Sequence, residues 1–447
     1  MKKNYGQTVL LLFFIAAVGF VVIKNKDEWK AGDKSVYNLQ PRKGNSNNAE
    51  WLAAKINVEK LQAKIKANPD DSRSLLSLAN AYITESRISG NIAYYDKAAL
   101  HTVDIILKKQ PDNYEALMLK SLLQLSQHHF ADGLATAQKA VSIDSNSAFV
   151  YGLLLDANVE MGNYPEAVDA AEKMVSIRPD LRSYSRIAYL REIHGDYTGA
   201  VTAMELAVQA GIPAEEVTEW CRVQLGRLYE LMGEIEKAKF QYNISLAARP
   251  GYAYALAGLG RIASFEKKYD SAVYYYEQAA NLITDLGIKE NLATAYFNMG
   301  QIEKSKNLNK EVIDEMNKAA KLLIEDPDAG HYSDKEQAYA YLKNNDLDKA
   351  LKYALAEYNR RPKNIEVNEM MAWVYYKRNE IDKALPYTNA ALLTNSMNPV
   401  LLCTAGLVYL KAGEIQKGKK MIELGLKNDP ILPEAVEKES TEALLLK

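Results

Sequence analysis

The chain has little of the residue types that build covalent frameworks or metal sites. Cys221 and Cys403 are the only cysteines among 447 residues, and no CxxC pair occurs. Neither a disulfide framework nor a thiolate zinc site is therefore expected. The adjacent His128 and His129 have no other histidine or cysteine nearby, and neighbouring helix positions point about 100° apart. We expect no metal and no cofactor.

The chain also lacks an excess of charge of either sign. Lysine and arginine number 55 against 57 acidic residues, which gives a formal charge of -2. A nucleic-acid binder uses a basic excess to displace counterions, so binding of DNA or RNA is not expected. Hydrophobic residues at 48% and charged residues at 25% are ordinary values for a folded globular chain.

Catalytic motifs are missing as well. No GxxxxGK[ST] phosphate loop occurs, and the Gly258-Leu259-Gly260 stretch lies inside a helical pattern without a preceding strand. Cys403 is expected to face an inner surface, but no base is identifiable beside it. We therefore predict that the chain is not an enzyme. A catalytic protein with an unrecognised site remains an alternative.

The first residues contain a membrane-targeting signal. An uncharged run over residues 9–23 (VLLLFFIAAVGFVVI) is flanked by lysines on both sides. Extended to residues 8–23, it would span about 24 Å as a helix, against about 30 Å for a hydrocarbon core. Flanking lysines can reach the interface and cover the difference. The run predicts a signal anchor within residues 1–25, a single transmembrane helix that meets the membrane through residues 8–23.

Two alternatives to the anchor remain open, a cleaved signal peptide and a buried helix. Ala17-Val18-Gly19 offers a cleavage site, but Phe20 to Ile23 continue the apolar run beyond it. A short amino tail favours an exported body, periplasmic or extracellular, and cleavage would make the protein secreted. Residues 26–48 are polar without apolar periodicity, which predicts a tether.

Small residues recur at a nearly constant spacing. One register comprises Gly133, Ala167, Ala200, Ala238, Ala272, Ser305, Ala350, Ala384 and Gly418, with successive differences of 34, 33, 38, 34, 33, 45, 34 and 34. A second register lies twelve positions earlier, at Ser121, Leu155, Ala188, Gly226, Gly260, Ala293, Ala338, Ala372 and Gly406. Two small positions per unit predict two closely packed helices. Turn signals such as Gly162-Asn163 and stops such as Pro179 separate these helices.

The repeat resembles the tetratricopeptide repeat, whose consensus is about 34 residues. The segment from Glu219 to Tyr252 matches it best, through Leu225, Gly226, Tyr229, Gly233, Ala238, Tyr242, Ser245 and Pro250. The resemblance implies an all-α fold, a right-handed α-solenoid of about ten units over residues 72–432. The units begin near residues 72, 114, 148, 181, 219, 253, 286, 331, 365 and 399.

Segments outside the regular register carry further expectations. Residues 49–71 and 433–447 predict capping helices, because a solenoid needs its terminal apolar faces covered. About eight extra residues around Thr84 to Tyr94 predict a long loop in the first unit. An uninterrupted helical stretch over residues 302–326 makes the unit from Leu286 the least regular.

A solenoid of this kind exposes a concave surface formed by the first helix of each unit. Positions two, five, six, nine and twelve of a unit are not needed for packing, so we expect them to face this surface. The residues expected to bind a peptide or protein are Arg182, Arg186, Tyr189, Trp220, Gln224, Arg227, Tyr254, Arg261, Tyr339 and Trp373. Guanidinium groups can fork onto carboxylates, and aromatic rings offer rigid apolar contact.

These observations predict a non-catalytic, membrane-anchored scaffold that holds a protein or peptide segment in its concave groove. The alternative is a recruitment or regulatory subunit of an enzyme complex that assembles an envelope polymer. The two hypotheses differ in whether the partner is a free peptide segment or an enzyme that co-purifies from membranes.

Overall fold

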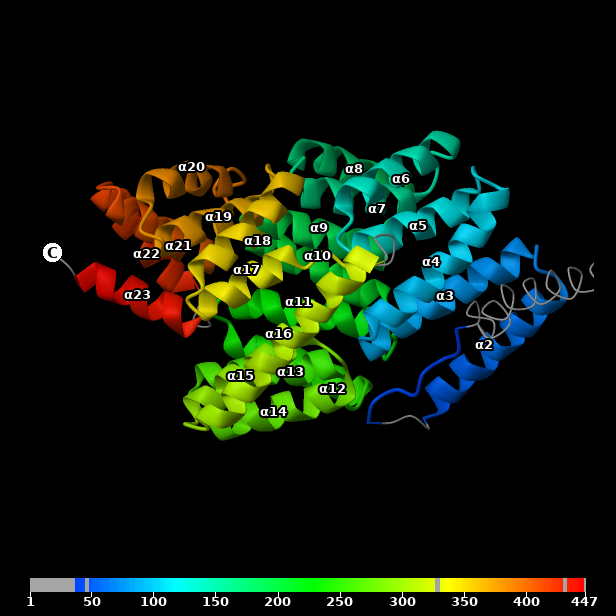
Figure 1. Ribbon diagram of the computed structural model, residues 1–447, viewed down its shortest axis with the longest axis horizontal. Coiled ribbons are helices and arrows are strands. Elements are labelled where there is room, and N and C mark those ends of the chain that lie inside the picture. The colour runs from blue at the N-terminus through cyan, green and yellow to red at the C-terminus, as the bar shows by residue number, and fades with distance from the viewer. Residues whose placement is uncertain (1–36, 45–47, 326–329, 429–431, 446–447) are drawn as a thin grey trace, which may run out of the picture.

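The computed structural model describes residues 37–44, 48–325, 330–428 and 432–445, and all regular elements within them are helices, α2 to α23 (Figure 1). The all-helical prediction is therefore confirmed for this part of the chain. The predicted membrane segment, residues 8–23, lies outside the described residues. Within them, no helix is both long and apolar enough to cross a bilayer.

Twenty of these helices pair as ten antiparallel hairpins, each with extensive contacts between its two members. The first five hairpins are α3 (Ser72–Ser89) with α4 (Ile92–Lys109), α5 (Tyr114–Ser126) with α6 (Phe130–Ile143), α7 (Ala148–Met161) with α8 (Tyr164–Ile177), α9 (Leu181–Ile193) with α10 (Tyr197–Ala210), and α11 (Glu216–Leu231) with α12 (Ile235–Ala248). The next five are α13 (Ala253–Phe265) with α14 (Tyr269–Leu282), α15 (Leu286–Asn298) with α16 (Ile302–Glu325), α17 (Asp334–Lys343) with α18 (Leu347–Arg360), α19 (Ile365–Lys377) with α20 (Ile381–Ala391), and α21 (Pro399–Lys411) with α22 (Ile415–Asn428). Helix α2 (Ala49–Ala67) precedes the hairpins and α23 (Glu434–Leu445) follows them.

The small residues of the repeat let neighbouring helices approach closely. Tyr242 of α12 is fully buried between α11 and α13. A Cβ atom added to Gly226 would lie 2.5 Å from Tyr242 Cε1, and one added to Gly258 would lie 2.5 Å from Tyr242 Cζ. These glycines are needed because the tyrosine ring fills the space that a side chain would occupy.

Replacing Tyr242 by Phe is expected to lower the free energy of unfolding by about 1.5–3 kcal/mol, because it removes a buried hydrogen bond to a carboxylate. The Tyr242 hydroxyl donates to Glu230 Oε1 at 2.5 Å and accepts from Arg261 Nη2 at 3.1 Å. Urea denaturation followed by circular dichroism measures the loss. Tyr274→Phe is the control, since Tyr274 is 58% exposed and should unfold as the wild type does. Equal midpoints for the two variants would contradict the prediction.

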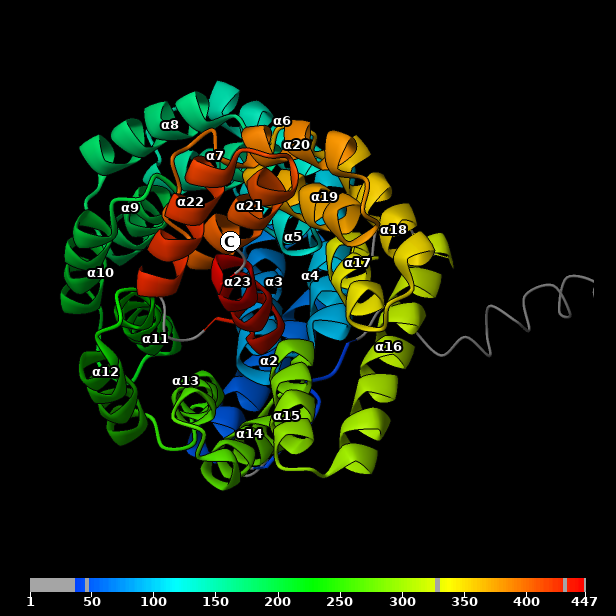
Figure 2. The same cartoon turned by 90° about the vertical axis from the view of Figure 1, so that its left-hand side faces the viewer.

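The hairpins follow a superhelix that meets itself after one turn (Figure 2). Second-turn loops lie against first-turn hairpins about 200 residues earlier: Tyr332 N donates to Gln127 O at 3.1 Å, and Ile365 N to Tyr164 Oη at 2.9 Å. At the beginning of the contact, Thr284 N donates to Ser89 O at 3.2 Å. We call this contact surface the seam. It comprises Ser89, Gly195 and residues 127–129 and 159–164 of the first turn, with Thr284, Asn395 and residues 330–332 and 361–365 of the second.

The seam is periodic. The turn inside a hairpin of the first superhelical turn contacts a loop between hairpins of the second, eleven helices farther along. The turn α3–α4 contacts the loop α14–α15, α5–α6 contacts α16–α17, α7–α8 contacts α18–α19, and α9–α10 contacts α20–α21. The same offset at four places shows that one turn of the superhelix comprises eleven helices, or five and a half hairpins.

The polar segment expected to be a tether is in part packed against the hairpins. Its first residues, 26–36, lie outside the described part of the chain. Tyr94 Oη donates to Asn38 O at 2.8 Å, and Gln40 N donates to Tyr95 Oη at 2.8 Å. Arg42 forms a buried ion pair with Glu85. Tyrosine hydroxyls therefore satisfy the backbone of this segment, which composition alone did not reveal.

Two further expectations, the long loop of the first hairpin and the position of Cys403, are wrong. The extra residues of the first hairpin lengthen α3 and α4 to 18 residues each, and the long loop expected there does not form. Gly90 ends α3 at φ 69° only after Tyr82 and Glu85 have been buried. Cys403, expected to face the inner surface, is fully buried in the core because α23 and α22 cover α21.

Candidate functional site

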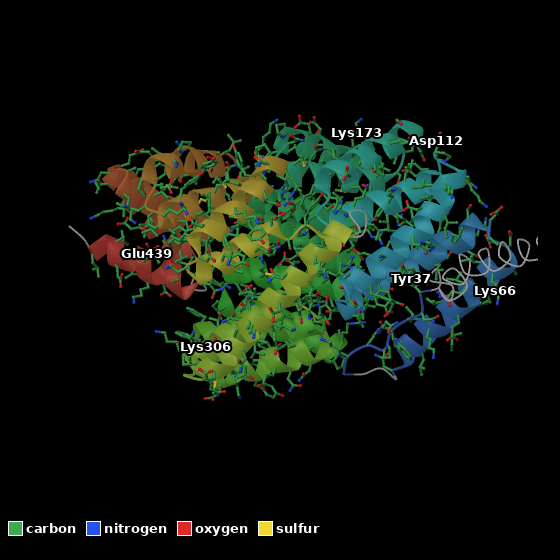
Figure 3. All side chains as sticks on the ribbon, viewed as in Figure 1. Tyr37, Lys66, Asp112, Lys173, Lys306 and Glu439 are labelled. Carbon is green, nitrogen blue, oxygen red and sulfur yellow. The ribbon has the colours of Figure 1, made fainter. Side chains whose placement is uncertain are left out.

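The first helix of each hairpin lines the inside of the superhelix, and the second lies outside (Figure 2). Helices α5, α7, α9 and α11 are inner, whereas α6, α8, α10 and α12 are outer (Figure 2). Side chains cover both surfaces along the whole length of the molecule (Figure 3). The inner surface of the first turn is where the expected binding arginines lie.

Three of the four arginines expected to bind a ligand are paired with carboxylates of the preceding hairpin. Arg186 Nε and Nη2 contact the two Asp156 oxygens at 2.7 to 2.9 Å. In the next pair, both Arg227 Nη atoms donate to Glu192 Oε1 at 2.8 Å. These contacts run from α9 to α7 and from α11 to α9, so they tie successive inner helices together.

The third pair joins α13 to α11. Arg261 Nε and Nη2 donate to the Glu230 carboxylate at 3.1 and 3.2 Å. We call the three pairs the arginine ladder. Glu192 and Glu230 lie one residue before the end of their inner helices, and Asp156 lies in the second half of α7. The stagger between hairpins brings each carboxylate beside an arginine of the next inner helix.

Electrostatics hold the ladder in place. Desolvation would lower the pKa of Arg227, but the adjacent Glu192 carboxylate raises it overall. Desolvation also raises the pKa of Glu192, against the opposing effect of Arg227. A ligand carboxylate could pair with Arg227 only by displacing Glu192. This displacement is unfavourable, because it would leave the Glu192 carboxylate unpaired.

Arg182 differs from the ladder arginines. Its side chain is exposed, and its Cζ lies 5.4 Å from the centroid of the Phe149 ring. The Asp180 carboxylate acts on Arg182 electrostatically, but Asp180 is itself paired with Arg178 at 3.2 Å. Desolvation and the charge of Arg186 lower the pKa of Arg182. Arg182 is thus the expected residue whose guanidinium remains available for an external anion.

Arg182 and Phe149 line both of two adjoining pockets, one along the inner helices α3, α5 and α7 and the other between the start of α7, the end of α8 and the start of α9. The larger pocket has a volume of about 500 Å³ and the smaller about 360 Å³. We call them together the inner groove. It is lined by Ser72, Arg73, Leu76, Ser77, Asn80, Asn113, Glu115, Met118, Leu119, Asn146, Ser147, Ala148, Phe149, Met174, Ile177, Arg178, Asp180, Arg182, Ser183 and Arg186.

The inner groove combines apolar and charged surface. Leu76, Met118 and Phe149 are partly buried and provide adaptable apolar contact. Arg73 and Arg182 are exposed at its edges. The arrangement can therefore hold an apolar side chain of a bound segment and pair with a carboxylate beside it.

The remaining expected residues lie outside the inner groove. Tyr189, Trp220, Gln224 and Tyr254 are partly buried on α9, α11 and α13. Desolvation raises the pKa of Tyr254 to about 12. These four side chains contribute to hairpin packing on the inner surface, and the structure does not gather them into one pocket with Arg182.

The expected residues of the second turn are covered by the chain itself. Tyr339 packs in the core of the last hairpins, and Trp373 is only 9% exposed, stacked on Tyr376 with ring centroids 5.0 Å apart. From α23, Glu439 accepts a hydrogen bond from Tyr376 Oη at 2.8 Å (Figure 3). The C-terminal helix thus lies over the inner surface at this end, and the groove stays open at the other.

Sequence reasoning missed several residues of the inner groove. Phe149 stands at the second position of its unit, Met118 at the fifth and Asn80 at the ninth. These are positions that the repeat register assigns to the concave surface. The repeat register therefore places these residues on the concave surface, although their units lack the arginine-rich pattern of the later ones.

Parts of the chain are similar to known proteins. No family model matches the chain. A curated relative, the formate-dependent nitrite reductase complex subunit NrfG of Escherichia coli O157:H7, is 28% identical over 120 residues, which are 27% of this chain and 58% of that subunit. The chain therefore spans a little over half of that relative's length.

Two solved structures are similar in fold. A tetratricopeptide repeat protein from Parabacteroides merdae ATCC 43184 is 16% identical with a TM-score of 0.42, over 53% of this chain and 90% of that one. PilW, a type IV pilus biogenesis factor, is 12% identical with a TM-score of 0.38, over 46% of this chain and 94% of that one. The described residues form an all-helical array of antiparallel hairpins.

Proposed function

We propose that the protein is a non-catalytic scaffold that binds a peptide or protein segment in the inner groove. The observation that supports this most is the position of Arg182, an exposed cation over an aromatic ring between two pockets, beside arginines that already have internal partners. The segment would place an apolar side chain against Phe149 and Met118 and a carboxylate against Arg182.

The proposal includes attachment to a membrane. The uncharged run over residues 8–23, flanked by lysines, supports a single-pass anchor with the helical body exported. A reporter enzyme fused after Lys447 that is active only outside the cytoplasm tests the orientation. Activity in membrane fractions indicates an exported, anchored body, and activity in the medium or the soluble envelope fraction indicates cleavage.

A second function has one observation in its favour. The matched relative is named as a subunit of a reductase complex, which supports a role in recruiting or regulating an enzyme. In this chain the enzyme would be one that assembles an envelope polymer. Reciprocal co-purification from membranes separates the two cases, because a free peptide segment would not bring an enzyme with it.

A photo-crosslinking amino acid placed at Met118 is expected to capture the partner in cells. The same amino acid at Lys306, on α16 (Figure 3), is expected to capture little. Met118 lies in the inner groove, whereas Lys306 is exposed on a helix that contributes no residue to the groove. Capture of the same species with equal yield from both positions would contradict binding in the groove.

Arg182→Ala is expected to reduce the yield of the Met118 cross-link about tenfold, because a hydrogen bond to a charged group contributes about 1.5–3 kcal/mol. Arg191→Ala is the matched control. Arg191 lies on the same helix, outside the groove, in an exposed ion pair with Asp196 at 2.8 Å, and such pairs contribute little. An unchanged cross-link in Arg182→Ala would remove the proposed role of this arginine.

A further inference from the structure

Three histidines lie on the seam, and each is hydrogen-bonded to backbone of the opposite superhelical turn. His128 Nδ1 donates to Tyr332 O at 2.9 Å, and His129 Nε2 donates to Gly330 O at 2.7 Å. In the reverse direction, the ring of His331 is hydrogen-bonded to the backbone of Ser126. Each superhelical turn therefore contributes at least one histidine ring that is hydrogen-bonded to the backbone of the other turn.

The rings are also packed against one another across the seam. The ring centroids of His128 and His331 are 4.1 Å apart, and those of His129 and Tyr332 are 4.3 Å apart. His128 stacks on Phe130 at 5.2 Å on its own side. The histidine cluster therefore fills the contact between the turn α5–α6 and the segment that leads into α17.

Neutral imidazole suits the positions of His128 and His331, and imidazolium does not. Each of these two rings is hydrogen-bonded to backbone of the opposite turn, and a neutral ring has no second N–H to satisfy. Protonation would add a donor and a charge inside a packed contact. Two protonated rings at 4.1 Å would also repel each other.

Cations already lie close to the cluster. Arg361 Cζ is 4.5 Å from the centroid of the Phe130 ring, and Arg360 Cζ is 4.3 Å from that of Tyr332. The charged and titratable groups that face the histidines are Asp132 on α6, Glu160 on α7, Asp334, Lys335 and Glu336 on α17, and Glu357, Arg360 and Arg361 at the end of α18. Arg360 and Arg361 are paired with the Glu357, Asp334 and Glu160 carboxylates, so these anions are not free to compensate additional positive charge.

We propose that the histidine cluster makes the seam acid-sensitive: neutral histidines hold the two superhelical turns together, and their protonation separates the turns. Opening would leave the hairpins folded, since each hairpin packs mainly on its neighbours in the array. The inference stands apart from the proposed function, because it concerns the contact between turns and not the ligand of the inner groove.

The direction of the pH effect follows from burial. Desolvation lowers the pKa of His128 to about 2 and that of His331 to about 4. In the open form both rings would regain an ordinary pKa of about 6.5. Closure is then fully favoured above about pH 6.5 and weakens as the pH falls from 6.5 toward 4, by up to about tenfold per pH unit for each histidine.

Hydrogen exchange of the full chain at pH 7 and pH 5 tests this inference. The reporters are the amides of Tyr332 and Ile365, whose acceptors Gln127 O and Tyr164 Oη belong to the other turn. With labelling times scaled for the intrinsic exchange rates, we expect both amides to lose at least tenfold in protection at pH 5. Circular dichroism should show unchanged helix content.

The double variant His128→Asn, His331→Gln is expected to keep the same protection at both pH values. Asparagine suits the left-handed conformation of His128, φ 62°, and its amide can still donate to a carbonyl. His101→Gln, at a partly buried histidine in the middle of α4 and away from the seam, should open as the wild type does. Unchanged protection of the wild type between pH 7 and 5, or equal loss in the double variant, would overturn the proposal.

Discussion

Replacing Gly162 by Ala is expected to open the seam at neutral pH. Gly162 ends α7 at φ 77°, and a Cβ atom there would lie 2.4 Å from the carbonyl carbon of Lys363 and 2.5 Å from its oxygen. Both atoms are backbone, so no rotamer change can relieve the overlap. The loop between α18 and α19 must move away, and the hydrogen bond from Ile365 N to Tyr164 Oη breaks with it.

Gly413→Ala separates the effect on the seam from backbone strain. Gly413 has φ 87°, and a Cβ atom there would meet nothing within 4 Å. Both substitutions carry a left-handed penalty of about 1–2 kcal/mol, but only the first forces the turns apart. Small-angle scattering should show a larger maximum dimension for Gly162→Ala alone. Superimposable scattering curves for the two variants would show that the seam is not closed in solution.

Replacing Arg361 by Met is expected to lower the free energy of unfolding by about 3 kcal/mol. The Arg361 side chain is 4% exposed and pairs with Glu357, itself 5% exposed, at 2.5 Å. It also pairs with Glu160 across the seam. Truncation would leave these carboxylates desolvated without their guanidinium partner. The effect lies at the lower end of the range for broken buried pairs because Arg360 still contacts Glu357.

Arg378→Met is the corresponding control. Arg378 pairs with Asp348, whose side chain is 92% exposed, so solvent replaces the lost interaction and the change should stay below about 1 kcal/mol. Thermal unfolding of both variants measures the difference. If Arg361→Met melts within a degree or two of Arg378→Met, the buried pair does not stabilise the fold as its burial implies.

The hairpins could be predicted from the sequence because their determinants are local. Small residues such as Gly226 lie where a ring such as that of Tyr242 packs, and glycine at positions such as Gly162 ends an inner helix in the left-handed conformation. Both signals repeat at nearly fixed spacing, so a single chain reveals them. The extra residues of the first hairpin lengthened its helices because Tyr82 and Glu85 could be buried there.

The arginine ladder was only half visible in the sequence. The register assigns Arg186, Arg227 and Arg261 to the inner surface, and it assigns Glu192 and Glu230 to the same surface. Whether these groups meet depends on the stagger between adjacent hairpins, which a linear spacing does not specify. The three pairs leave Arg182 as the exposed guanidinium. Only the three-dimensional structure distinguishes Arg182 from the paired arginines.

The seam had no sequence signal of its own. Its hydrogen bonds join residues 195 to 205 positions apart, and their existence depends on small packing angles added over several hairpins. From the sequence alone, His128 and His129 resemble adjacent residues of a helix, whereas in the structure His128 lies in a turn and His129 precedes α6. Their partners belong to a part of the chain that no local pattern connects with them.

The periodic seam also constrains how this array can change length. An open solenoid tolerates the gain or loss of a whole repeat, because each repeat touches only its neighbours. Here, deleting one hairpin between the paired turns would bring every hairpin turn opposite the wrong loop, and Arg361 would face a residue other than Glu160. Duplication would do the same in the other direction. The seam therefore constrains the number of repeats between the two turns, and we expect natural length variants to differ at the ends of the array.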